Sequence, residues 1–154
     1  RYKPVLNGFS VPVARMLCRL VFISFVIKIV LQAATVIPDL GHAVFGLRPI
    51  IIGFLHLVFL GLASFYILSE YTERGILQPG KILAGSALKG FVLAVIAQES
   101  VLLIQGGGLL FGRSNPVYNW ILWGLSIFLF IFALLMSISA IKNQQQEFEP
   151  KRNS

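Results

Sequence analysis

Four long apolar runs, separated by short polar stretches, dominate the pattern of residues along the chain. A helix needs about 20 mostly apolar residues to cross a bilayer, and each run reaches that length. The pattern therefore predicts an all-α fold, a bundle of four transmembrane helices joined by short connections. We expect the crossings at residues 16–36, 49–69, 82–104 and 118–141.

Polar and helix-breaking residues mark the segments outside these runs. Residues 1–15 contain Pro4 and Pro12, which interrupt helices, so they predict an arm at the membrane surface. Residues 142–154 are polar and predict a tail. The three consecutive glycines at 106–108 predict a loop between the third and fourth crossings.

The composition supports a membrane protein rather than a water-soluble domain. Hydrophobic residues make up 56% of the chain and charged residues only 12%, whereas soluble domains carry about 25% charged residues. So few charges cannot cover a water-facing surface, so most of the surface must face lipid. The chain has one cysteine, Cys18, which cannot form an internal disulfide.

The basic residues are distributed unevenly between the two predicted membrane surfaces. Of the 13 Lys and Arg residues, Arg48 and Arg113 lie on the side away from the termini and Lys28 lies inside the membrane, whereas the others lie on the side of the termini. The positive-inside rule then places both termini in the cytoplasm. The membrane we expect is a bacterial inner membrane. The net charge of +7 reflects this topology and contact with anionic lipid, so we expect no nucleic-acid partner.

Several polar side chains fall within the predicted crossings at a similar depth. With a rise of about 1.5 Å per residue, Lys28, His56 and Glu99 lie about 7–12 Å below the outer boundary. Gln32 shares the helix face of Lys28, and Gln98 adjoins Glu99. Charged groups in hydrocarbon usually face the protein interior and find partners. The sequence therefore predicts a buried polar site with a Lys28–Glu99 ion pair or a shared water-filled pocket, and His56 nearby.

Each of these residues allows a packing role as well as a functional one. Lys28 and Glu99 form either an ion pair that fixes helix packing or part of a functional pathway. Gln32 and Gln98 suit interhelical hydrogen bonds. His56 is a hydrogen-bonded packing residue, a metal or haem ligand, or a contact for a proton or a quinone.

The two histidines together do not complete a haem site. His42, near the outer surface, is an ordinary loop histidine or a second haem ligand, and the chain has no histidine besides His42 and His56. A site with two axial ligands on one haem would therefore need a Met, a Lys or another subunit. Five-coordinate haem needs only one protein ligand.

The run from Gly53 to Gly61 around His56, continuing to the segment Tyr71–Gly75, resembles helices of the NnrS-like membrane proteins. These proteins are related in architecture to the catalytic subunit of haem-copper oxidases. The resemblance covers about 30 of the 154 residues. It implies haem binding, with His56 and then His42 as candidate ligands. It also implies that this chain corresponds to a portion of a longer protein, because that family has more crossings and more histidines.

Three functional hypotheses follow. The first is a helical subunit or fragment of a bacterial respiratory-type membrane protein, with His56 near a redox cofactor, haem or quinone. The second is an accessory or assembly subunit whose polar residues only fix helix packing. The third is a proton or small-solute transport module that uses Lys28, His56 and Glu99. The expected partners are the lipid bilayer and either other membrane subunits or further crossings of a longer chain.

Catalytic motifs do not select among these hypotheses. The sequence has no Cys/His cluster with zinc-ligand spacing. It also has no nucleophile elbow, and Asp39 is its only aspartate. A soluble hydrolase or transferase is therefore disfavoured, and the sequence does not decide whether the protein is an enzyme.

Overall fold

A computed structural model of the chain describes residues 11–38, 41, 48–112 and 115–148. The long elements are helices because apolar runs in lipid must satisfy their backbone hydrogen bonds within the segment. In chain order these are α1 (Pro12–Ala34), α3 (Arg48–His56), the π-helix η2 (Leu57–Ser64), α4 (Phe65–Glu73), α5 (Ile82–Leu110) and α6 (Val117–Phe148). α3, η2 and α4 follow one another without a break, and we call Arg48–Glu73 the second crossing.

The predicted fold class is confirmed. Within the described residues, four helical stretches are long and apolar enough to cross a membrane: Pro12–Ala34, Arg48–Glu73, Ile82–Leu109 and Val117–Asn143. The chain is therefore an all-α, multi-pass membrane protein. Its first crossing begins at Pro12, inside the predicted arm, because proline is tolerated in the first helical turn.

The predicted loop at the three glycines is wrong, because α5 continues through them to Leu110. Gly106 packs against α3, where an added Cβ would lie 3.0 Å from Cγ1 of Ile50. This close contact between helices outweighs the low helix propensity of glycine. Likewise α6 continues to Phe148, so residues 142–148 of the predicted tail are helical. Residues 1–10 of the predicted arm and 149–154 of the tail lie outside the described residues.

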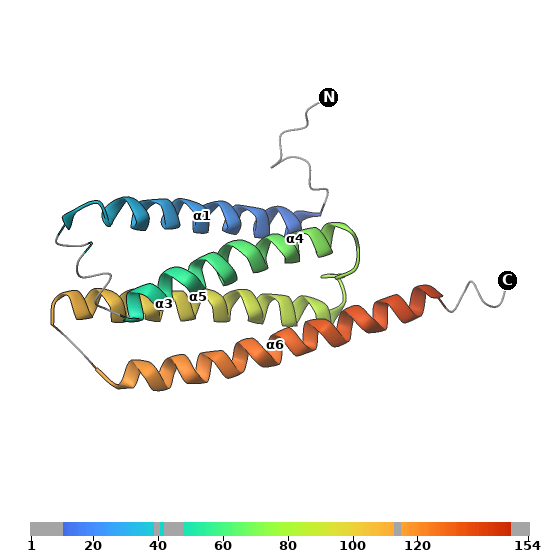
Figure 1. Cartoon of the computed structure of the whole chain (residues 1–154). Helices are drawn as coiled ribbons and strands as arrows, with labels where there is room; N and C mark the ends of the chain where they lie inside the picture. The colour runs from blue at the N-terminus through green and yellow to red at the C-terminus, as the bar shows by residue number, and fades with distance from the viewer. Residues whose placement is uncertain (1–10, 39–40, 42–47, 113–114, 149–154) are drawn as a thin grey trace, which may run out of the picture.

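The helices pack in a row rather than around a central axis (Figure 1). α1 packs against η2 and α4, α3 packs against α5, and α5 packs against α6. The second crossing therefore runs diagonally, close to α1 at its α4 end and to α5 at its α3 end. We call the end of the bundle where α1 and α5 begin and α4 and α6 end the terminal end, and the opposite end the distal end (Figure 1).

The apolar core surrounds α5 in the terminal half of the bundle. It includes Leu17 of α1, Phe65 of α4, Leu88 and Val95 of α5, and Met136 of α6. Half of the apolar stretch that defines the third crossing is buried inside the protein, against 11% of the corresponding stretch in the first and the fourth crossings. α5 is therefore the central helix, and α1 and α6 present most of their surface to lipid.

Candidate intramembrane polar site

His56 is the last residue of α3 and is half-buried. Its Nδ1 lies 2.9 Å from the carbonyl oxygen of Ile52, one turn back in the same helix. A carbonyl oxygen only accepts hydrogen bonds, so this bond requires the proton on Nδ1. In the neutral ring, Nε2 is then the nitrogen left to accept a proton or to bind a metal.

The π-helix begins at the residue after His56. Its wider turn is formed by i→i+5 backbone hydrogen bonds, and such segments occur frequently at functional sites. The hydroxyl of Ser64 follows the same spacing and donates to the carbonyl of Phe59 at 3.0 Å. Gly61, in the middle of η2, lies directly against α1, where an added Cβ would be 2.7 Å from Oγ of Ser24.

Packing between α3 and α5 brings His56 level with Glu99. Gly53 of α3 packs on α5, where an added Cβ would lie 3.5 Å from Cβ of Leu102. The two helices are antiparallel neighbours in the row, so three residues onward from Gly53 correspond to three residues back from Leu102 (Figure 1). These are His56 and Glu99. Both lie within about 60° of the faces that make this contact.

Lys28 of α1 lies at a similar depth. The contact between Ser24 and Gly61 sets the register of α1 against η2. Four residues onward from Ser24 is Lys28, which shares its helix face and comes level with Leu57, next to His56. Lys28 is half-buried. The register thus agrees with the common depth that the sequence predicts for the three ionisable residues.

The predicted Lys28–Glu99 ion pair is not formed. Among the residues that the structure describes, the one ion pair joins Arg74 to Glu70 at 2.7 Å, at the terminal end. The reason is the order of the helices, because α1 packs against η2 and α4 whereas α5 packs against α3 and α6. The carboxylate of Glu99 therefore has no Lys, Arg or His nitrogen of a described residue within 4.0 Å.

The polar side chains of α5 keep buried oxygen atoms without a described partner. Gln98 is only 4% exposed and is the most deeply buried of the predicted site residues. Its Oε1, the Oε1 of Glu99 and the Oε1 of Gln105 are buried and accept no hydrogen bond from any described residue. The predicted interhelical hydrogen bond of Gln98 is thus not formed among the described residues. These three oxygens give the distal half of α5 an unsatisfied hydrogen-bonding capacity.

The prediction that Gln32 is buried is wrong, because its side chain is exposed. Gln32 lies one turn beyond Lys28, near the distal end of α1. There the second crossing has moved away from α1 toward α5 (Figure 1). That end of α1 consequently has no extensive contact with another described helix.

Gln105 and Asn119 form a link between α5 and α6 that the sequence analysis missed. Nε2 of Gln105 donates to Oδ1 of Asn119 at 3.0 Å. Placing Gln105 in a loop concealed this bond. The signal was the pair of amide side chains at the facing ends of two consecutive apolar runs.

Among the described residues, His56 is the only histidine. His42 lies outside the described residues, so its position as a ligand is untested. Among the described residues, no three His, Cys, Asp or Glu side chains gather as a metal site. Met16 lies near the start of α1 and Met136 in the terminal half, away from His56. A six-coordinate haem on His56 would therefore need Lys28 or a ligand from outside this part of the chain.

Comparison with protein-family models, curated proteins and solved structures finds no match. The resemblance to NnrS-like proteins therefore remains an expectation drawn from the sequence around His56. The functional assignment depends on the geometry of the site.

Proposed function

We propose that the chain is a membrane-embedded proton-transfer module, with Glu99 and His56 as the groups that bind and release the proton. The observation that supports this most directly is the position of Glu99. Its Oε1 is buried without a described partner, and the packing register sets it level with His56. Carboxyl and imidazole groups inside a membrane are the usual components of proton relays.

The three ionisable residues would have different roles. Nδ1 of His56 is held by the Ile52 carbonyl, so its Nε2 would take up and return the proton. Glu99 would exchange the proton through its carboxyl group. Lys28 would offset the negative charge that Glu99 carries after proton release. Because no ion pair joins these side chains, proton transfer between His56 and Glu99 would require bridging water.

Proton flux into vesicles tests the proposal. Purified protein is reconstituted in liposomes that contain a pH-sensitive dye, and a potassium diffusion potential drives protons inward. We expect faster acidification than in protein-free liposomes of the same lipid. Equal rates, with insertion of the protein verified, would contradict proton transfer and favour an accessory subunit whose polar residues fix packing.

A second candidate is a respiratory-type subunit in which His56 contacts haem or a quinone. The hydrogen bond from Nδ1 to a backbone carbonyl favours it, because this arrangement orients Nε2 of a histidine toward a metal. The remaining ligand would come from a partner subunit or from another part of a longer chain. In that case the lipid bilayer and neighbouring membrane subunits are the partners of the chain.

The visible spectrum of the purified protein tests the haem version of this second candidate. We expect a Soret band in the wild type and its loss in His56→Ala, because the substitution removes the metal-binding nitrogen. Gln98→Ala removes a polar side chain of α5 that has no imidazole nitrogen, and this variant should retain the band. A wild-type protein with no Soret absorption after haem supplementation would exclude the haem version.

We also propose that the terminal end faces the cytoplasm of a bacterial inner membrane. The described helix ends there carry five basic residues against three acidic ones: Arg15, Arg19, Arg74, Lys81, Lys142, Glu70, Glu73 and Glu147. At the distal end the described helices begin or end with one basic residue, Arg48. This asymmetry follows the positive-inside rule.

A further inference from the structure

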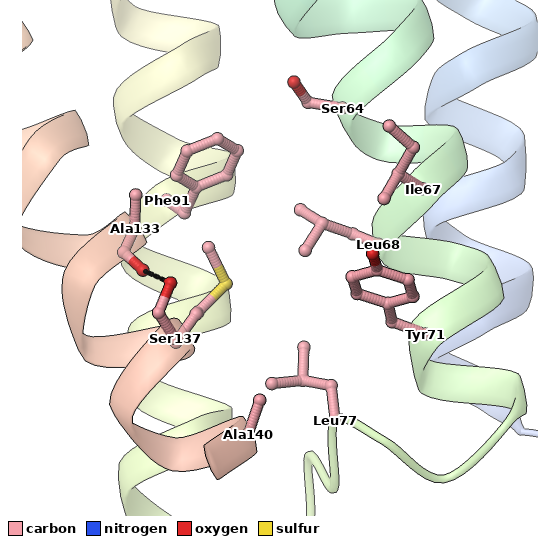
Figure 2. A pocket seen from close by; sticks show the side chains of 10 residues that line it. Ser64, Ile67, Leu68, Tyr71, Leu77, Phe91, Ala133, Ser137 and Ala140 are labelled. Carbon is pink, nitrogen blue, oxygen red and sulfur yellow. Dashed lines mark hydrogen bonds between the residues drawn. The ribbon is translucent and has the colours of Figure 1, made fainter.

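An apolar groove lies between α4 and α6 in the terminal half of the bundle (Figure 2). Phe91 of α5 lies between the two walls of the groove. The volume of the groove is about 300 Å³. The hydroxyl of Ser64 bonds to the carbonyl of Phe59, and that of Ser137 to the carbonyl of Ala133. These hydroxyls are already satisfied within their own helices, so the groove offers hydrocarbon contacts.

The size of the groove suits a hydrocarbon chain. One wall extends from Ser64, the last residue of η2, to Tyr71 of α4, and the other from Ala133 to Ala140 on α6. Each corresponds to about 10 Å along the helix. The volume of about 300 Å³ over that length gives a cross-section of about 30 Å². The groove therefore has room for one hydrocarbon chain lying along it.

The segment that connects α4 to α5 borders the terminal end of the groove. Leu77 of this segment lies at that end (Figure 2). Asn143 of α6 ties the segment to α6, because its Oδ1 accepts from Nζ of Lys81 at 2.6 Å and its Nδ2 donates to the Ile76 carbonyl at 3.4 Å. The groove therefore lies within the leaflet at the terminal end.

The charge at this membrane surface favours a negative headgroup. Arg74 follows Tyr71 by about one turn, and its side chain is 67% exposed. Its Nη2 and Nε donate to Glu70 at 2.7 and 2.8 Å, which leaves Nη1 for a headgroup. The described helix ends at this surface have a net excess of basic residues, five against three acidic ones. Basic residues close to the membrane surface attract anionic lipids.

We propose that the groove binds one acyl chain of an anionic phospholipid from the leaflet at the terminal end, with its headgroup beside Arg74. The acyl chain would contact α4, α5 and α6 together. α4 and α6 do not pack extensively against each other, so the lipid would fill the gap between them. Dispersion contacts along the groove and attraction to the basic surface supply the affinity.

Native mass spectrometry of protein released from nanodiscs tests this proposal. The nanodiscs contain equal amounts of phosphatidylglycerol and phosphatidylcholine of the same chain length. We expect the wild type to retain one phosphatidylglycerol molecule. Ala133→Phe, which fills the groove, should lose it, as should the smaller change Ser137→Leu. Ile138→Phe is the matched control, because Ile138 is exposed on the same helix outside the groove, and it should keep the lipid.

The headgroup contact is tested separately with Arg74→Gln. We expect the preference for phosphatidylglycerol to fall by about fivefold, the effect of about one basic residue near an anionic leaflet. Retention of the lipid by folded Ala133→Phe and Ser137→Leu would overturn the proposal. So would a wild type without bound lipid, equal retention of both lipids by the wild type, or a dimer that dissociates in Ala133→Phe, which would indicate a second copy in the groove.

Discussion

Replacing Glu99 with Gln is expected to reduce proton flux in proteoliposomes by about a hundredfold or more, the typical contribution of a positioned proton-transfer group. Gln has nearly the same shape as Glu and keeps an oxygen at the position of the buried Oε1. It cannot bind and release a proton in the physiological range. The substitution therefore removes the chemistry of the site while leaving its packing nearly unchanged.

The same substitution at Glu70 is the control. Glu70 lies at the terminal end, where it pairs with Arg74 at 2.7 Å, away from the proposed relay. Glu70→Gln should therefore keep the wild-type flux. Wild-type flux in a folded and inserted Glu99→Gln protein would show that Glu99 does not carry the proton, even if the wild type conducts.

Replacing Gly61 with Leu is expected to lower the free energy of unfolding by about 1–3 kcal/mol, the usual cost of overpacking a tight contact. An added Cβ at Gly61 would lie 2.7 Å from Oγ and 3.1 Å from Cβ of Ser24. A larger side chain must push α1 away from η2. The major contacts of α1 are all with the second crossing. No other helix can therefore compensate for the loss.

Gly124→Leu is the matched control for this prediction. Gly124 also lies within a membrane-spanning helix, but nothing is within 4 Å of the position of an added Cβ. This variant should match or exceed the wild-type stability, because glycine is a poor helix former. Thermal unfolding in detergent, followed by thiol labelling of Cys18 in α1, the only cysteine, measures both. Equal unfolding temperatures for the two variants would contradict the assigned contact.

Much of the fold was predictable because the bilayer restricts the choices. Each apolar run has to be helical and long enough to cross, so its length and composition define a crossing. Helix ends were harder to predict, as Gln105 and Gly106 show. They lie inside α5 because Ile50 and Asn119 pack against them, and these partners are distant in the sequence.

For the candidate site, the approximate depth of Lys28, His56 and Glu99 could be predicted from their positions within the apolar runs. Depth along a helix follows from the rise per residue and the ends of the apolar run, and the packing register agrees with it. The tertiary structure alone decided which helices are neighbours. Gly61 brings α1 to η2 and Gly53 brings α3 to α5, so the second crossing separates α1 from α5. Lys28 therefore does not pair with Glu99, because neighbour choice depends on the shapes of facing side chains, which hydropathy along the chain does not contain.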